Sequence, residues 1–224
     1  LDTDTYNEID DQFALAYMLC RKDRINLKSI CAAPFHNAKS DNPADGMEKS
    51  FQEIHHILKL MGKEEYAGQV YRGSTEWLSD EETPLCSEAA EKLAELAVGY
   101  SPEKPLYIVA IGAITNVASA LLLKPEITDR IVIVWLGGNA HHWPDNMEFN
   151  CGQDVAAARV VFGSGAAVVQ LPCAGVVSAF KTTAGELEMS LRGKNRLCDY
   201  LVDIVERDGA AESPYKTWSR VIWD

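Results

Sequence analysis

The 224-residue sequence lacks the features that mark several specialised classes of protein. It has no run of eighteen or more apolar residues, so no transmembrane helix is expected. Its six cysteines are scattered without CxxC spacing, which favours reduced core thiols in a cytoplasmic protein. It has no internal repeat, and no GxGxxG motif opens a helix, so the fingerprint of a dinucleotide-binding protein is missing as well.

Positive charge is also scarce. The chain has 21 Lys and Arg residues against 33 Asp and Glu residues, which gives a formal net charge of −12. This charge repels phosphate backbones and anionic lipids unless a basic patch overrides it, and the sequence contains no such patch. We therefore expect neither a nucleic acid nor a membrane as partner. The apolar fraction of 47% is that of an ordinary globular protein, and the length fits one domain spanning residues 1–224.

Short β-branched runs alternate with longer helical patterns, which is typical of βαβ units and a parallel sheet. Several of the strand-like runs are continuously apolar, as strands buried on both faces are. We therefore expect an α/β fold with an open, doubly wound, mostly parallel sheet and helices on both faces, followed from about residue 178 by a mainly helical region. The expected strands are 1–3, 27–33, 106–110, 131–136 and 167–171, and the expected helices are 11–21, 44–61, 87–100, 115–123, 155–162 and 196–207.

Four carboxylates gather around the end of the first expected strand: Asp2, Asp4, Asp10 and Asp11. Such groups repel one another and raise each other's pKa unless a cation or strong hydrogen-bond donors neutralise them. Carboxylates without nearby Cys or His suit a hard cation, Ca²⁺ or Mg²⁺. The alternative is an acidic turn that caps the next helix. Capping needs only Asp10 or Asp11, so the pattern favours a metal site.

Polar or glycine-rich segments follow four of the expected strands. Asp4 follows the first strand and Asn37 the second, while Gly112 and Asn139 follow the strands at 106–110 and 131–136. Ligands of doubly wound sheets bind outside the carboxyl ends of the strands. The four segments therefore predict one site at a single edge of the sheet.

These segments resemble, in the same order and over nearly the full chain, those of the inosine-uridine-type nucleoside hydrolases. The acidic segment at 2–11 is similar to the family signature Asp-x-Asp-Pro-Gly-x-Asp-Asp, with Thr5-Tyr6 in place of Pro-Gly and two residues added before the acidic pair. The other matching segments are Pro34-Phe35-His36-Asn37, Ile111-Gly112-Ala113-Ile114-Thr115-Asn116, and Gly137-Gly138 followed by Glu148-Phe149-Asn150.

The resemblance implies a calcium-dependent enzyme that hydrolyses the N-glycosidic bond of ribonucleosides. The reaction passes through an oxocarbenium-like ribosyl cation, which surrounding carboxylates stabilise. By the same resemblance Asp4 is the general base for the attacking water, and the Ca²⁺ ligands are Asp4, Asp11, the carbonyl of Ile111, and Asp224. The implied ribose-binding residues are Asp10, Asn37, Glu148 and Asn150, with Asn139 and its rival Asn146 as candidates for a further one.

The pair Trp223-Asp224 bears on the nucleobase. Many of these hydrolases have His before the last ligating Asp, and Trp there is similar to the purine-preferring branch, in which an indole stacks on the base. We therefore expect purine nucleosides to be favoured. Trp77 is a candidate for the opposing stacking partner, and His141 or His142 for base recognition. Packing in the core is the alternative for both tryptophans.

Two other functions stay open. A haloacid-dehalogenase-type phosphatase would use Asp2 as nucleophile with Mg²⁺, and a riboside-binding protein would keep the ribose contacts without cleaving the substrate. The resemblance also implies a homo-oligomer, a dimer or tetramer. Compared with the family, we expect this chain to lack the first few residues and the C-terminal ones.

Overall fold

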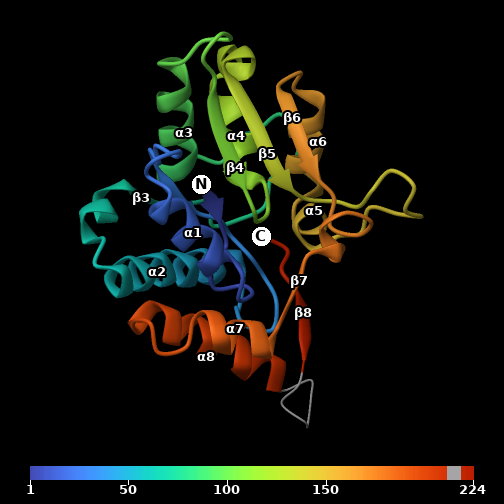
Figure 1. The fold of residues 1–224 in the computed structure, drawn as a ribbon. Coiled ribbons are helices and arrows are strands. Elements are labelled where there is room, and N and C mark those ends of the chain that lie inside the picture. Colours follow the sequence, from blue (N-terminus) through green and yellow to red (C-terminus); the bar gives the residue numbers. More distant parts are fainter. Residues whose placement is uncertain (211–217) are drawn as a thin grey trace.

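The computed structural model describes residues 1–210 and 218–224. Its main sheet consists of parallel strands in the order β3-β2-β1-β4-β5-β6 (Figure 1). Strand β1 lies between β2 and β4, with Asp2 opposite both Cys31 and Ala110. The strand order reverses here, so the carboxyl ends of β1 and β4 form the switch point of the sheet. The strands are β1 (Asp2–Thr3), β2 (Ile30–Ala32), β3 (Val70–Arg72), β4 (Leu106–Ala110), β5 (Ile131–Leu136) and β6 (Ala167–Leu171).

Helices pack on both faces of this sheet, which confirms the predicted doubly wound α/β fold. On one face, Leu93, Val117 and Val161 join side chains of β4 and β5 in one buried cluster. On the other face, Leu15 and Ile54 pack with side chains of β2 and with Leu1, which precedes β1. The first face carries α3 (Glu88–Val98), α4 (Thr115–Leu123) and α6 (Val155–Gly163), and the second carries α1 (Asp11–Cys20) and α2 (Pro43–Met61).

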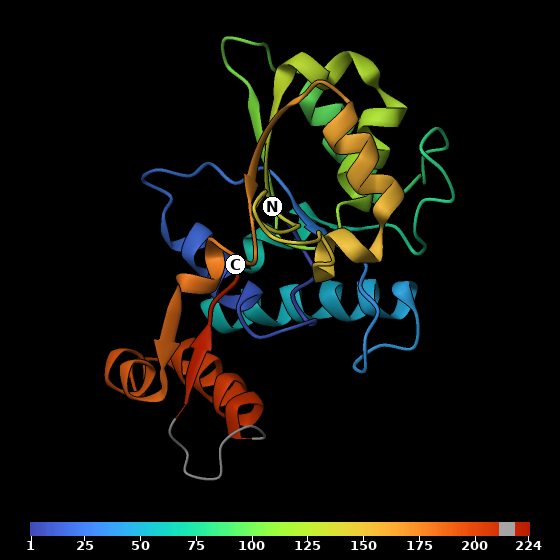
Figure 2. The ribbon, with the colours of Figure 1, turned by 90° about the vertical axis from the view of Figure 1, so that its right-hand side faces the viewer.

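The C-terminal region forms a lobe beyond α2, as both ribbon views show (Figures 1 and 2). Helix α8 (Arg196–Ala210) packs against α2, and the hydroxyl of Tyr200 donates to Glu53 at 2.5 Å. From β8 the chain returns to the centre of the molecule, where it ends (Figure 1). The lobe also contains β7 (Lys181–Thr183), α7 (Ala184–Ser190) and β8 (Ser219–Val221).

The structure differs from the expected elements mainly where the elements are short. Strand β3 was not predicted, and the expected strand at 27–33 is reduced to Ile30–Ala32. The region after residue 178, expected to be mainly helical, contains the antiparallel pair β7 and β8. Strands of three residues are too short to show a period of two, so no pattern marks them. Other unpredicted elements are α5 (Phe149–Gln153) and short 3₁₀ segments at Glu64–Gln69, Pro125–Arg130 and Val177–Ala179.

Within the described residues, no helix combines the length and the apolar character that crossing a membrane requires.

Candidate active site

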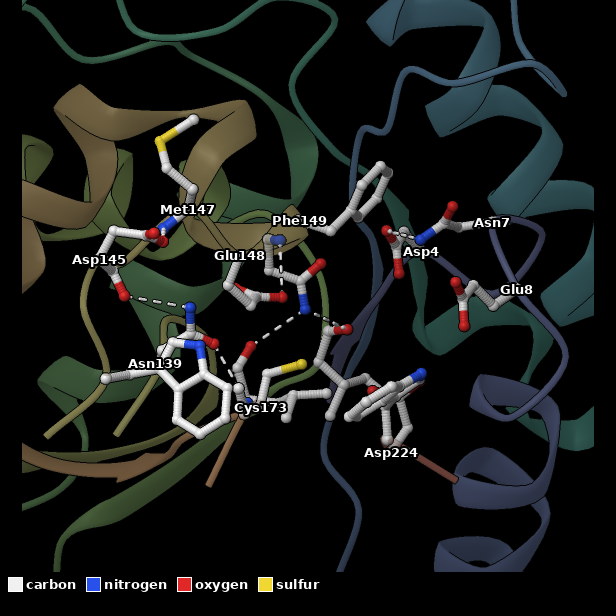
Figure 3. A pocket seen from close by; sticks show the side chains of 16 residues that line it. Asp4, Asn7, Glu8, Asn139, Asp145, Met147, Glu148, Phe149, Cys173 and Asp224 are labelled. Atoms are coloured by element: carbon white, nitrogen blue, oxygen red, sulfur yellow. Dashed lines mark hydrogen bonds between the residues drawn. The ribbon is translucent and has the colours of Figure 1, made fainter. Parts of the chain in front are cut away.

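A cavity of about 420 Å³ opens at the carboxyl ends of β1, β4 and β5 (Figure 3). Figure 3 shows Asp4, Asn7, Glu8 and Asp224 on one side of it and Asn139, Asp145 and Glu148 on the other. None of the described residues that line it is Lys, Arg or His. Its walls are therefore acidic and aromatic: they include the carboxylates of Asp4, Glu8, Asp145, Glu148 and Asp224 and the indoles of Trp143 and Trp223.

Carboxylates from two distant segments of the chain meet beneath the cavity. One oxygen each of Asp10, Asp11 and Asp224 lies within 4.8 Å of the others. Burial, strengthened by the charge of Asp10, raises the pKa of Asp11 to about 7. Desolvation and the charge of Asp11 raise the pKa values of Asp4 and Asp224 well above the ordinary range. In the absence of a cation, burial and mutual repulsion therefore oppose the ionisation of these carboxyl groups.

Three carboxylate oxygens of this group have no partner. Among the described residues, Oδ1 of Asp4, of Asp10 and of Asp224 is buried without a hydrogen bond. An unpaired buried acceptor costs free energy, and the cost is larger when the group is charged. A cation bound by these oxygens would remove that cost, and an all-oxygen donor set suits Ca²⁺ or Mg²⁺. The residues present therefore fit a hard divalent cation.

The two acidic residues at the start of α1 are held by other parts of the chain. Asp10 occupies the N-cap position, but its side chain makes no capping hydrogen bond. Its Oδ2 accepts instead from the backbone N–H of Trp223 at 2.7 Å. Asp11 accepts a hydrogen bond from the hydroxyl of Thr3. The capping alternative is therefore wrong for Asp10, and the positive end of the α1 dipole adds further stabilisation for negative charge.

Asp2 lies beneath the site and not in it. It is fully buried and does not line the cavity. Its Oδ1 accepts from Nδ2 of Asn116 at 2.8 Å, and Oδ1 of Asn116 accepts from the backbone N–H of Ser74 at 2.8 Å. Burial raises the pKa of Asp2 to about 7. Asp2 thus supports the sheet edge from below, and it is not exposed as the phosphatase alternative requires.

The end of β4 approaches Asp4 closely because residue 112 is glycine. A Cβ atom at Gly112 would lie 3.0 Å from Cγ of Asp4 and 3.1 Å from Cβ of Ala33. This approach brings Ile111 into the cavity lining beside Asp4. The carbonyl of Ile111, a predicted ligand, accepts from Nδ2 of Asn150 at 3.2 Å. One of the two lone pairs on that oxygen is therefore already in use.

Glu148 and Asn150 line the cavity and also hold its far wall together. The Glu148 carboxylate accepts from the backbone N–H groups of Gly138 at 2.7 Å, Asn150 at 3.0 Å and Cys151 at 3.0 Å, and so begins α5. Burial raises the pKa of Glu148, and these three donors oppose the rise. Nδ2 of Asn150 also donates to the carbonyl of Leu136 at 3.0 Å. Both side chains are thus oriented by the backbone of neighbouring loops.

The two rival asparagines lie in one turn. Asn139 lines the cavity, while Oδ1 of Asn146 accepts from the backbone N–H of Asn139 at 2.5 Å. Nδ2 of Asn139 donates to the carbonyl of Asp145 at 3.2 Å. Gly138 has φ of 70°, and a Cβ atom there would lie 2.6 Å from Oδ1 of Asn146. Of the two residues, Asn139 is the one that faces the cavity.

Four other predicted residues lie outside the lining. Asp10 and Asp11 are beneath it, Asn37 is behind the loop of residues 5–9, and Trp77 is half-buried elsewhere. The histidines at 141 and 142 are exposed and also outside the lining, whereas Trp143 beside them is part of it. Sequence analysis missed Asn7, Glu8 and Trp143. The two added residues in the acidic loop were the available signal for the first two.

The fold and site together define an α/β protein with a carboxylate-rich cavity at the switch point of a parallel sheet, and the carboxylates at this cavity suit a divalent cation. The profile described as inosine-uridine preferring nucleoside hydrolase matches residues 1–213, so the chain belongs to that family.

Individual relatives are similar over parts of their length. The non-specific ribonucleoside hydrolase RihC of Salmonella paratyphi B is 34% identical over 97 residues, which are 42% of this chain and only 31% of that protein. A purine-preferring ribonucleoside hydrolase from Gardnerella vaginalis has a similar fold, with a TM-score of 0.71 and 23% identity over 96% of this chain and 73% of that one. The effector protein XopQ, solved with adenosine diphosphate ribose, gives a TM-score of 0.69 and 16% identity over 95% of this chain and 66% of that one.

Proposed function

We propose that this protein hydrolyses the N-glycosidic bond of ribonucleosides in a Ca²⁺-dependent reaction, with purine nucleosides favoured, and releases free base and ribose. Family membership supports the reaction class. The observation that carries the proposal is the convergence of Asp10, Asp11 and Asp224 beneath an open cavity that Asp4 and Asp224 line, with orphaned buried oxygens on Asp4, Asp10 and Asp224.

In this proposal the cation is held by Asp4, Asp11, Asp224 and the carbonyl of Ile111. Calcium bound there would neutralise the carboxylates and orient both the ribose diol and the attacking water. Asp4 accepts a proton from the attacking water while the oxygen of that water bonds to C1′. The bond from C1′ to the base nitrogen breaks at the same time, and the base leaves with that electron pair and is protonated by solvent. Asp4 suits this role because its carboxylate lines the cavity beside Ile111 and Asp224, where a water on the cation would lie within its reach.

The charge of the cavity supports a neutral substrate. Five carboxylates line it, and no described lining residue is cationic. These groups stabilise the positive charge that develops on the ribose ring in the transition state. The same groups repel a phosphate, even after a divalent cation has neutralised two charges. The proposed substrates are therefore nucleosides and not nucleotides.

Two indoles support a preference for an aromatic base of large area. Trp223 and Trp143 both line the cavity, and Trp143 is 47% exposed. An indole stacks on a purine over a larger area than on a pyrimidine. Trp143 thus takes the role that sequence analysis gave to Trp77. We also propose that the protein is cytoplasmic, because its cysteines lack the spacing of a disulfide or metal motif. From the resemblance we propose a dimer or tetramer, which sedimentation velocity would test.

The decisive experiment measures free ribose after incubation with inosine, guanosine, adenosine, uridine and cytidine, with Ca²⁺ or with a chelator. We expect ribose from the purine nucleosides, in excess over the pyrimidine ones, and only with Ca²⁺. Calorimetry with inosine runs in parallel. Binding without release of ribose would favour the riboside-binding alternative. Neither binding nor release would overturn the proposal.

A further inference from the structure

Asn7 lies in the part of the acidic loop that two extra residues lengthen. It is 5% exposed and lines the cavity next to Asp4 (Figure 3). All four of its polar groups have partners. The backbone N–H donates to the carbonyl of Asp4 at 2.7 Å, and the backbone carbonyl accepts from Nζ of Lys39 at 2.8 Å. The backbone of Asn7 is therefore held by hydrogen bonds that do not involve its side chain.

Of the two carboxylate oxygens of Asp4, the side chain of Asn7 bonds to one. Nδ2 of Asn7 donates to Oδ2 of Asp4 at 3.1 Å. Oδ1 of Asp4 is buried without a partner in the described structure. An amide donor on Oδ2 sets the rotation of the carboxylate about its terminal bond, which is otherwise a broad and soft torsion. The two oxygens of Asp4 are thus made unequal by Asn7.

Asn37 acts on Asn7 and not on the cavity. Its Nδ2 donates to Oδ1 of Asn7 at 2.7 Å, and its Oδ1 accepts from the backbone N–H of Lys39 at 2.8 Å. Both ends of the Asn37 amide are therefore already engaged, and Asn37 itself lies outside the lining. The bond to Oδ1 of Asn7 also fixes which end of the Asn7 amide faces Asp4, because a donor on Asn37 requires an acceptor there.

We propose that Asn7 is a positioning residue that orients the Asp4 carboxylate. It holds Oδ2 by a hydrogen bond and thereby directs Oδ1 to the cation. Asn37 then contributes through Asn7, in place of the direct ribose contact that the sequence predicted. A donor placed behind a metal-ligating carboxylate orients the ligand and tunes its affinity for the metal. The kinetic part of this inference rests on the proposed function, whereas its cation-binding part does not.

The competing account is that Asn7 only stabilises the conformation of the loop and has no effect on Asp4. Two variants separate the accounts. Asn7→Ala keeps both backbone hydrogen bonds of residue 7 and removes only the contact with Asp4 and the contact with Asn37. Lys39→Met removes the side-chain bond to the carbonyl of Asn7 and keeps the Asn7 amide. Asn26→Ala, at an exposed residue near the opposite end of the sheet, is the neutral control.

The first measurement is calorimetric titration of Ca²⁺ into chelator-stripped protein, without substrate. We expect Asn7→Ala to weaken Ca²⁺ binding by about tenfold or more, and Asn37→Ala to weaken it in the same direction by less. Lys39→Met and Asn26→Ala stay within about twofold of the unmodified protein, since neither touches Asp4. Thermal unfolding in chelator checks that each variant is folded. If Asn7→Ala does not fold, the result for Asn37→Ala against Lys39→Met decides.

The second measurement is steady-state hydrolysis of inosine at saturating Ca²⁺. We expect Asn7→Ala to lower kcat by roughly 10- to 100-fold while KM changes little, because the base is misoriented and the ribose contacts remain. Normal Ca²⁺ affinity in Asn7→Ala, or equal losses in Asn7→Ala and Lys39→Met, would overturn the inference. If the unmodified protein hydrolyses nothing, the proposed function fails, and the calorimetric comparison still tests Asn7.

Discussion

The backbone N–H of Trp223 donates to Oδ2 of Asp10 at 2.7 Å, so the end of the described chain is bonded to the start of α1. The same return of the chain from β8 places Asp224 beside Asp10 and Asp11. Residues more than two hundred positions apart therefore complete one acidic site. The strand pair β7 and β8 delivers the last residues of the chain to that site.

Replacement of Asp4 tests the general base. Asp4→Asn keeps the size of the side chain and removes both the proton acceptor and one charge toward the cation. We expect kcat for inosine to fall by about 10²- to 10⁴-fold, with the fold retained. Asp23→Asn, at an exposed residue beyond the other end of α1, is the matched control and should be neutral. Near-normal turnover of Asp4→Asn would refute the assigned role.

Replacement of the tryptophans tests recognition of the base. Trp223→Ala and Trp143→Ala should each lower turnover of inosine more than that of a nitrophenyl riboside, whose leaving group needs no protonation. The expected loss for inosine is about 10-fold per indole, from lost stacking. Trp77→Ala, outside the cavity lining, should affect both substrates alike and weakly. Equal losses on both substrates for Trp223→Ala would remove the stacking argument.

Sequence patterns predicted the parts of this molecule that repeat or that lie next to one another in the chain. The long helices at 44–61 and 115–123 show the helical period over several turns, and their bounds differ from the structure by at most one residue. Asp4 and Ile111 were predicted to meet because parallel strands end at one edge. The added residues of the acidic loop mark the region of Asn7, but the side-chain directions of Asn7 and Trp143 depend on loop conformations that no period describes. Trp77 illustrates the converse error: an aromatic in a nearby loop does not have to face the site.

The buried carboxyl groups predict a pH-dependent stability for the chelated protein. The pKa values of Asp2 and Asp11 rise from 3.8 to about 7, chiefly through burial. A carboxyl with a raised folded pKa stabilises the fold fully below its unfolded pKa, and this contribution is lost as pH rises through the folded pKa. In chelator, the contribution of these two groups to the free energy of unfolding should therefore decline between about pH 4 and pH 7.

Denaturant unfolding at pH 5, 6, 7 and 8 measures this decline. The Asp2→Asn variant isolates the part of the decline that comes from Asp2. Asp2 lies outside the cavity, so Ca²⁺ does not compensate its charge. The variant should show a shallower decline than the unmodified protein, both with and without Ca²⁺. Added Ca²⁺ should stabilise both proteins, and more at pH 8 than at pH 5, because the cation requires ionised ligands. Identical pH slopes for the two proteins would contradict the assignment of a raised pKa to Asp2.

Glu8 provides the sharpest test of the exclusion of nucleotides. It lines the cavity, contacts Arg220 at 3.5 Å, and its charge contributes to the raised pKa values of Asp4 and Asp11. Glu8→Gln removes one negative charge from the cavity and keeps the positive charge of Arg220. The resulting change in net charge favours an anionic ligand. We expect the inhibition constant of inosine 5′-monophosphate to fall by about fivefold relative to the KM of inosine, and the gain to shrink at high salt. Glu76→Gln, exposed and outside the lining, should change neither constant. A parallel change for nucleoside and nucleotide would mean that Glu8 acts through the shape of the loop and not through its charge.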